Sequence, residues 1–276
     1  MQIGPSQIQN PIKGLPPLVG SGNWQGFLKN NTMEYLNNTD GLLFPIDEFI
    51  DPVMMAKNTN GNNNAGTHRH RKEHCNNLDL CLSLDFIGKY EMSPIAPYTG
   101  KIPSSLIPFN ASTSCTDYDC GVHFYIDDYM FERIWHSIEK YIPILKRFSC
   151  VIGPDFSQYC DMPKPMRIWN CFRNRVVSTV MQKAGVNLIP NVTWSLPDSY
   201  EYSFDGMPTN SVIAINCTSI INNNLSKYLW YKGYNEAITR LRPKWILRYG
   251  TKMPDERFEI STYFENERLK ALRNGR

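Results

Sequence analysis

Three aspartates stand where they could carry out acid–base chemistry. Asp127 follows the apolar run 122–126, Asp155 follows the run 150–152, and Asp205 lies in a polar segment further along the chain. A carboxylate can accept or donate a proton, and its oxygens are ligands that Mg²⁺ prefers. We therefore predict Asp127, Asp155 and Asp205 as catalytic residues, acting as acid, base or Mg²⁺ ligands.

The same kind of residue also suits a structural role. Asp caps helices and forms turns, because its side chain accepts hydrogen bonds from free backbone N–H groups. Asp127, Asp128 and Asp155 all stand where a strand would lead into a helix, and caps are the more common role of Asp there. The sequence leaves both interpretations open.

Amide, hydroxyl, aromatic and guanidinium side chains near the same loops could bind a substrate. The predicted binding residues after the apolar runs are Ser157, Asn191, Trp194 and Asn216. Arg167 and Arg173 add guanidinium groups, which suit phosphate or carboxylate. These arginines do not form one tight stripe with Arg175, so a solvated helix face or internal ion pairs is the alternative.

His and Cys residues near the segment 68–75 offer zinc ligands. Cys81, Cys115 and Cys120 could complete such a site from elsewhere in the chain. No standard zinc spacing is matched, so no metal ligands are assigned. The alternative is a basic loop that contacts an acidic partner.

Regular elements after Cys120 should position the candidate residues. Short apolar runs predict strands at 122–126, 150–152, 186–189, 211–215 and 245–247. Helices are expected from Asp127 to a break near Ile142 caused by Pro143, from Pro165 to Gly185, at 198–204, and from a Ser226 cap to a stop at Pro243. A weak helical pattern continues through 255–276.

Repeated strand-then-helix units predict an α/β fold with a mainly parallel sheet. Nearly continuous apolar strands separated by helices are typical of such sheets. The units suit either a barrel-like or a doubly wound arrangement, and we favour the barrel-like one. In both, the carboxyl ends of the strands lie at one edge, where the candidate residues should meet.

Composition divides the chain into three parts. Residues 1–110 are rich in Pro and Asn and predict an irregular N-terminal extension with a polar loop at 57–66. Residues 111–253 form the predicted α/β domain, and residues 254–276 form a charged C-terminal segment.

Charge and hydropathy limit which kinds of partner and which cellular compartment are expected for this protein. A net charge of +3 is too small to indicate a nucleic-acid partner by itself. No apolar stretch is long enough to span a membrane, and the N-terminus lacks the pattern of a signal peptide. We therefore expect a cytoplasmic protein without a membrane partner.

A series of short motifs resembles one known family. The motifs are HFYIDD at 123–128, GPDFS at 153–157, DMP at 161–163, NCFRNR at 170–175, IPNVTW at 189–194 and FDG at 204–206. In this order they resemble the family known as domain of unknown function 4417. The resemblance implies an origin in a phage or mobile element and action inside a bacterial host, and it implies no particular activity.

Two classes of function remain open. The first is an enzyme that acts on a nucleotide, nucleic acid or sugar-like substrate at the carboxyl ends of the strands. The second is a binding or assembly protein that contacts a host protein or nucleic acid through the N-terminal extension and the basic segment 68–74. The sequence identifies no cofactor and no oligomeric state.

Overall fold

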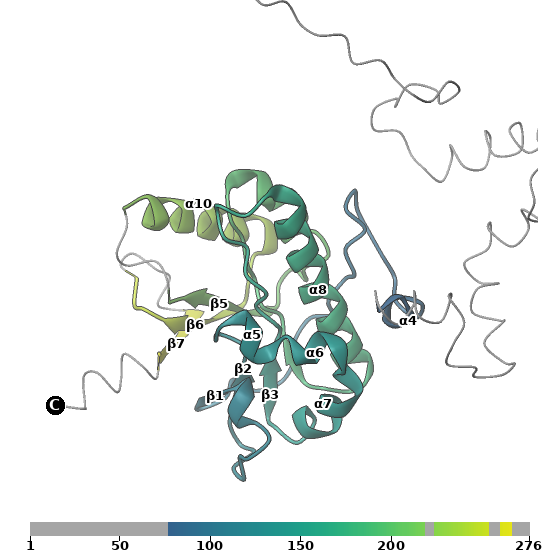
Figure 1. Cartoon of the computed structure of the whole chain (residues 1–276). Helices are drawn as coiled ribbons and strands as arrows, with labels where there is room; N and C mark the ends of the chain where they lie inside the picture. Colours follow the sequence, from purple (N-terminus) through teal and green to yellow (C-terminus); the bar gives the residue numbers. More distant parts are fainter. Residues whose placement is uncertain (1–76, 219–223, 254–259, 267–276) are drawn as a thin grey trace, which may run out of the picture. The chain divides into compact units, whose positions relative to one another are not determined.

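The computed structural model describes residues 77–218, 224–253 and 260–266, which all lie in one compact unit, residues 65–276 (Figure 1). The predicted loop at 57–66 and the basic segment 68–75 lie outside the described residues. The strands are β1 (Leu106–Pro108), β2 (Gly121–His123), β3 (Cys150–Ile152), β4 (Leu188–Ile189), β5 (Val212–Cys217), β6 (Trp245–Gly250) and β7 (Ser261–Glu265).

Helices separate most of the strands, as expected for an α/β fold. The α-helices are α4 (Leu78–Cys81), α5 (Asp128–Phe131), α6 (Arg133–His136), α7 (Ile138–Leu145), α8 (Lys164–Lys183), α9 (Tyr200–Ser203) and α10 (Asn224–Leu241). Two 3-10 turns are described, η3 (Phe109–Ala111) and η4 (Pro197–Ser199). None of the described helices combines the length and the apolar character needed to cross a membrane.

The described strands pair in parallel and follow one another in chain order. One sheet has the order β1-β2-β3-β4, and the other has the order β5-β6-β7. Asn191, just after β4, forms a parallel bridge with Ala214 of β5. Two backbone hydrogen bonds of 2.8 Å flank this bridge, from Val192 N to Ala214 O and from Ala214 N to Pro190 O. The two sheets therefore continue one another.

The sheets curl around a shared interior. The ring of His123 in β2 lies 4.3 Å from the ring of Tyr249 in β6, although the two strands belong to different sheets. Alternate residues of each strand face this interior, such as Ala214 in β5, while their neighbours Ile213 and Ile215 face the helices. The described strands follow the chain order without a reversal, and together with the packed interior this corresponds to the barrel-like arrangement.

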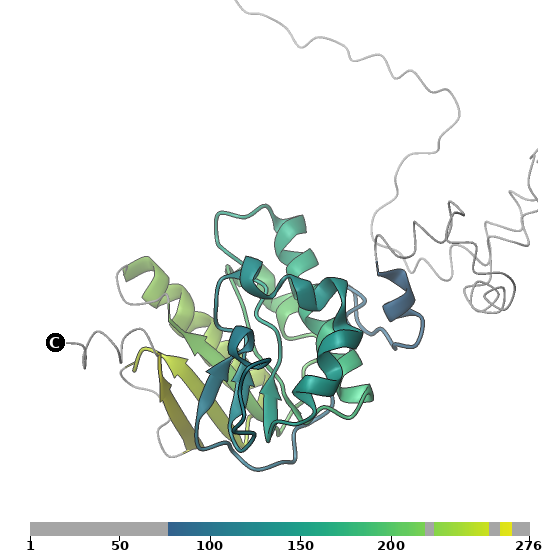
Figure 2. The same cartoon turned by 60° about the horizontal axis from the view of Figure 1, so that its bottom comes forward.

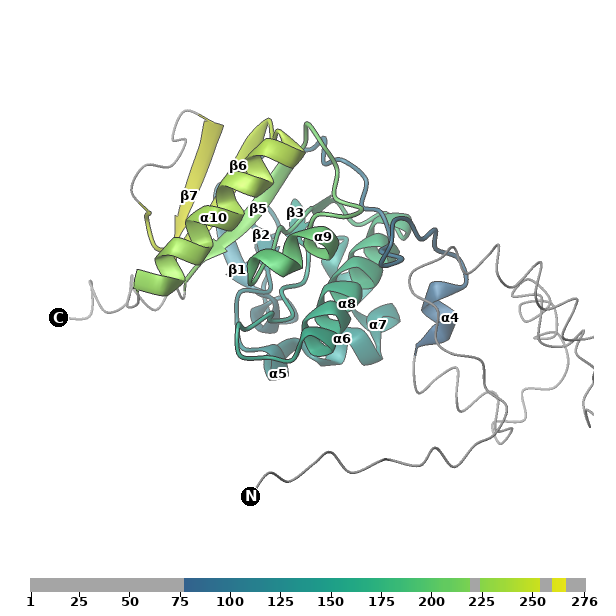
Figure 3. The same cartoon turned by 90° about the horizontal axis from the view of Figure 1, so that it is seen from above.

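The helices lie outside the curled strands (Figure 2). Figure 3 shows α10 lying along β5 and β6, with α8 as a second long helix of the layer. Apolar side chains of both helices pack against the outward-facing residues of the strands in one core cluster. Cys150 and Cys217 are both fully buried in their strands, where they pack as small core residues.

Three local predictions were wrong. The chain after Asp127 is divided at Glu132 and Ser137, not at Ile142, and Pro143 lies inside α7. In so short a helix proline removes a single internal hydrogen bond, whereas Ser137 leaves the helical conformation with φ of −154°. Ser226 is not a cap, because α10 already begins at Asn224.

The third difference is at the C-terminal end, where Ser261–Glu265 forms β7 instead of a helix. β7 pairs in parallel with β6 along its whole length. A sheet edge offers unpaired backbone N–H and C=O groups, and Tyr263 and Phe264 belong to the aromatic residues that favour strands. This long-range pairing outweighs the weak helical spacing of the segment.

Candidate functional site

A hollow opens at the carboxyl ends of the strands, the edge where the sequence placed the candidate residues. Its volume is about 380 Å³. It is lined by Tyr125, Ile126, Asp127, Asp155, Phe156, Ser157, Gln158, Tyr159, Val192, Thr193, Trp194, Asn216, Thr218, Trp230 and Asn266. Loops after β2, β3, β4 and β5 therefore contribute to one concave surface, which is where ligands bind in barrel-like α/β folds.

Asp155, in the loop after β3, is bonded to the loop after β4 and to the end of β5. Its side chain is partly buried, and both carboxylate oxygens accept hydrogen bonds from asparagine amides. Asn191 Nδ2, after β4, donates to Oδ1 at 3.0 Å, and Asn216 Nδ2, in β5, donates to Oδ2 at 2.9 Å. Three predicted site residues thus form one hydrogen-bonded group.

The orientation of both amides is set by further partners. The Tyr125 hydroxyl donates to Asn191 Oδ1 at 2.9 Å, so the amide NH₂ of Asn191 must face Asp155. Thr218 donates to Asn216 Oδ1 from its backbone N–H at 2.9 Å and from its hydroxyl at 2.7 Å. Because each amide oxygen already accepts a hydrogen bond, each amide presents its donor to the carboxylate.

The pKa of Asp155 reflects this environment. Burial is the main reason why the pKa of the carboxyl is raised to about 6, and the nearby negative charge of Asp128 acts in the same direction. The hydrogen bonds from Asn216 and Asn191 act in the opposite direction, since they stabilise the charged form. The carboxyl therefore changes its charge close to neutral pH, as general acids and bases do.

The two aspartates after β2 have different roles. Asp127 is exposed, lines the hollow and stands at the N-cap position directly before α5, yet its side chain makes no capping hydrogen bond. Asp128 accepts hydrogen bonds from the backbone N–H of Ser157 at 3.0 Å and from its hydroxyl at 2.8 Å. The cap interpretation thus fails for Asp127, while Asp128 joins the loop after β3 to the start of α5.

Four of the predicted site residues do not line the hollow: Asn191, which donates to Asp155, and three that are not part of this hydrogen-bonded group. Arg167 donates to both carboxylate oxygens of Asp198, at 3.0 and 3.3 Å. Arg173 donates to Glu132 at 2.5 Å and forms an ion pair with it. Both arginines therefore have the internal ion pairs that the sequence left as the alternative to an anion site.

Asp205 is the third of these residues. A side chain on Gly88 would meet its carboxylate at 1.8 Å, which places Asp205 against the segment before β1. Burial raises its pKa, and the nearby charge of Arg175 lowers it. The structure thus separates Asp205 from the group formed by Asp155.

Several lining residues carried no signal in the sequence. Tyr125 belongs to an apolar run and was expected to be part of a strand. Trp230 lies inside α10, and only the packing of this helix on β5 brings its ring to the hollow, where its Nε1 donates to Asn216 O at 3.3 Å. Gln158 and Tyr159 follow the recognised motif GPDFS, so a search of the loop beyond Ser157 would have found them.

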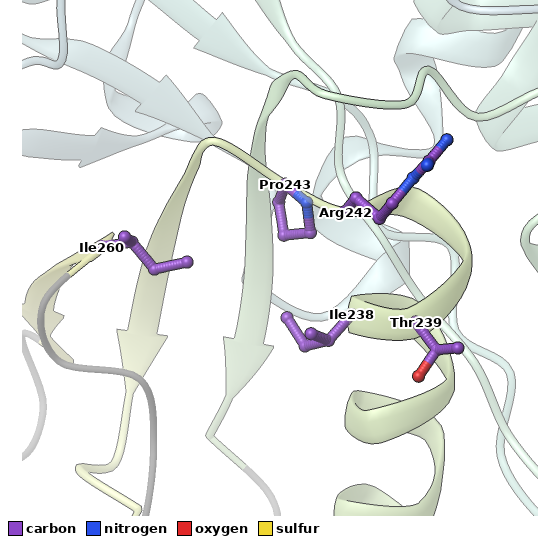
Figure 4. A pocket seen from close by; sticks show the side chains of 5 residues that line it. All are labelled: Ile238, Thr239, Arg242, Pro243 and Ile260. Atoms are coloured by element: carbon purple, nitrogen blue, oxygen red, sulfur yellow. The ribbon is translucent and has the colours of Figure 1, made fainter.

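A second hollow lies at the opposite end of α10. Its volume is about 320 Å³, and its lining consists of Ile238, Thr239, Arg242, Pro243 and Ile260 (Figure 4). Figure 4 shows that Arg242 points away from Pro243 and Ile260. The remaining side chains are apolar apart from one hydroxyl, so this hollow offers no acid–base group.

The described residues do not bring together a metal site. Within them, no group of three or more His, Cys, Asp or Glu side chains is arranged to hold a metal ion. In particular, Asp205 lies apart from Asp127 and Asp155, so these three do not form the predicted Mg²⁺ ligand set. The zinc candidates at 68–75 lie outside the described residues.

Comparison with known proteins places the chain among phage proteins. Residues 85–265 match the model of the family described as Domain of unknown function (DUF4417), which confirms the resemblance of the motifs. The chain is 31% identical over 210 residues to the Gene 1 protein of Mycobacterium phage L5, covering 72% of this chain and 90% of that protein. It is 29% identical over 205 residues to the Gene 1 protein of Mycobacterium phage D29, covering 70% and 75% respectively. No solved structure matches.

Proposed function

The chain belongs to the DUF4417 family of phage proteins, and on this premise we propose that it is an enzyme in which Asp155 acts as a general base. The printed names of the relatives state no activity, so the chemistry of the site carries the proposal. We place its action inside the infected host cell, because both relatives come from mycobacteriophages.

One observation supports the role of Asp155 above all others. Its carboxyl lines the hollow, is held by Asn191 and Asn216, and has a pKa raised by burial to about 6. A general base is most effective when its pKa lies near the working pH, because it is then both deprotonated and basic enough to take a proton. Asp155 meets both conditions at neutral pH.

The hydrogen bonds leave room for a reacting proton. An ionised carboxylate has roughly four lone-pair positions, and the two amides occupy one on each oxygen. We propose that a substrate O–H or N–H donates to a remaining position, and that its proton moves to Asp155 as the substrate oxygen or nitrogen reacts. The proton then returns to the product or to water.

The test is a turnover screen with a matched variant. The full chain is incubated with p-nitrophenyl glycosides, nucleosides and nucleotides, and the products are measured by absorbance and mass spectrometry. We expect one of these groups to be converted, and we expect Asp155→Asn to lower the rate by about a hundredfold or more while the melting temperature is retained.

Asp161→Asn is the control, because Asp161 is exposed and does not line the hollow. Its rate should equal that of the unchanged protein. Full activity of Asp155→Asn would refute the role of Asp155, and conversion of none of the probes would favour the alternative of a binding or assembly protein.

A further inference from the structure

Two tryptophans form one wall of the hollow. Trp194, after β4, and Trp230, in α10, both line it, and their ring centroids lie 6.0 Å apart with the rings tilted by 47°. Trp230 is 6% exposed, whereas Trp194 is only partly buried. Most of the Trp230 ring is therefore covered, and Trp194 retains surface that a ligand can contact.

A glycine in α10 keeps Trp194 in this place. A Cβ atom on Gly233 would lie 2.1 Å from Trp194 Nε1 and 2.2 Å from its Cδ1. The edge of the indole thus rests directly on the backbone of the helix, where any larger residue would displace it. Gly233 has no left-handed backbone angle, so space for Trp194 is the reason for a glycine here.

The charged side chains of the described lining are all carboxylates. Asp127 and Asp155 contribute carboxylates, and among the described lining residues none is Lys or Arg. Such a surface attracts groups that donate hydrogen bonds and repels phosphate and carboxylate groups. The ligand that fits carries hydroxyl groups and no negative charge.

Aromatic rings and carboxylates that line the same hollow suit one class of small molecule. A sugar ring presents a face of C–H groups that packs on tryptophan and an edge of hydroxyl groups that donate to carboxylates. From this combination we infer that the hollow binds the ring of an uncharged sugar, with its face on Trp194 and its hydroxyl groups directed to Asp155 and Asp127. This inference rests on the proposed function and names the substrate class of the same site.

Binding is measured separately from turnover. The full chain is titrated with methyl β-glucopyranoside, N-acetylglucosamine, ribose, glucose 6-phosphate and adenine, and binding is followed by saturation-transfer NMR and by tryptophan fluorescence. We expect at least one uncharged sugar to bind, glucose 6-phosphate to bind more weakly than glucoside, and Trp194→Ala to weaken sugar binding by about tenfold or more.

Trp169→Ala is the matched control, because Trp169 is an exposed tryptophan of α8 outside the hollow. Trp169→Ala should bind sugar as tightly as the unchanged protein does. In the separate turnover assay, Asp155→Asn should lose activity. Tighter binding of adenine or of glucose 6-phosphate than of any sugar, or sugar binding unchanged in Trp194→Ala, would overturn the inference.

The two proposals fail in different ways. Sugar binding that depends on Trp194 without turnover that depends on Asp155 would overturn the proposed function and support the sugar site. If the protein converts a substrate that has no sugar ring, and this turnover depends on Asp155, the proposed function is supported and the sugar site is overturned.

Discussion

Asp155 combines two requirements that oppose each other in a folded protein. Its charge is needed for proton transfer, yet burial disfavours that charge, and the amides of Asn191 and Asn216 compensate for only part of the cost. Asp155 and its two asparagine partners are therefore arranged for chemistry, although this arrangement lowers the stability of the fold. Tyr125 and Thr218 act through the two asparagines, because they hold the amide oxygens and leave the NH₂ groups for Asp155.

The first consequence is a dependence of stability on pH. The pKa of Asp155 rises from 3.8 to about 6 on folding, so the folded protein holds this proton more tightly than the unfolded chain. Stability from this proton is fully present below about pH 4 and is lost as the pH rises through about 6. Relative to Asp155→Asn, the protein should lose about 2 kcal/mol of unfolding free energy between these limits.

Urea unfolding of both proteins at pH 4 and pH 8 measures this difference. Asp161→Asn serves as the control, since its exposed side chain has no burial cost to relieve. If Asp155→Asn and the unchanged protein differ in unfolding free energy by the same amount at pH 4 and at pH 8, the raised pKa of Asp155 is contradicted.

At the scale of elements, the packing of α10 on the strand ends shapes the hollow. This helix supplies Trp230 and the bare backbone at Gly233 against which Trp194 rests. A glycine inside a helix costs roughly 0.5–1 kcal/mol relative to alanine. In α10 this loss of helix stability makes room for the side chain of Trp194, which comes from the loop after β4.

This packing predicts that one substitution has opposite effects in two backgrounds. Gly233→Ala should destabilise the unchanged protein by about 1–3 kcal/mol, because its Cβ overlaps the indole of Trp194. In the Trp194→Ala background the space is free, and the same substitution should stabilise by about 0.5–1 kcal/mol through helix propensity. Urea unfolding of the four proteins of this cycle gives both values, and the same sign in both backgrounds would rule out the contact.

At the scale of the whole molecule, β7 completes the family unit. The family match ends at residue 265, which is also the last residue of β7. β7 covers the edge of β6, and its Thr262 accepts a hydrogen bond from Trp245 Nε1 at 2.9 Å. The segment that composition marked as a charged C-terminal part thus contributes a strand to the sheet.

Removal of β7 should therefore damage the domain. A variant that ends at Met253 exposes the backbone groups of β6, and its melting temperature should fall by at least about 5 °C, equivalent to roughly 2 kcal/mol, with increased aggregation. A variant that ends at Asn266 keeps β7 and is the control. Differential scanning calorimetry and light scattering compare them, and equal melting temperatures would show that β7 contributes no stability.

The local elements and the edge where chemistry is possible could be read from the sequence alone. Apolar runs predicted the strand Cys150–Ile152 without error, and Gly185, with φ of +87°, lies just after the end of α8 as expected. These features depend on neighbouring residues, whose spacing and backbone preferences can be read from the chain. Parallel strands share one carboxyl edge, so Asp155, Asn191 and Asn216 could be placed at the same edge in advance.

Which of those side chains meet depends on how the chain packs in three dimensions. The sequence predicted both Arg167 and Asn191 as binding residues. In the structure Arg167 is paired with Asp198, whereas Asn191 donates a hydrogen bond to Asp155. The curl of the sheets and the pairing of β6 with β7 join residues far apart in the chain, and their energies depend on long-range packing that local spacing does not encode. For this reason the sequence could indicate the edge of the site, whereas the fold selected its members.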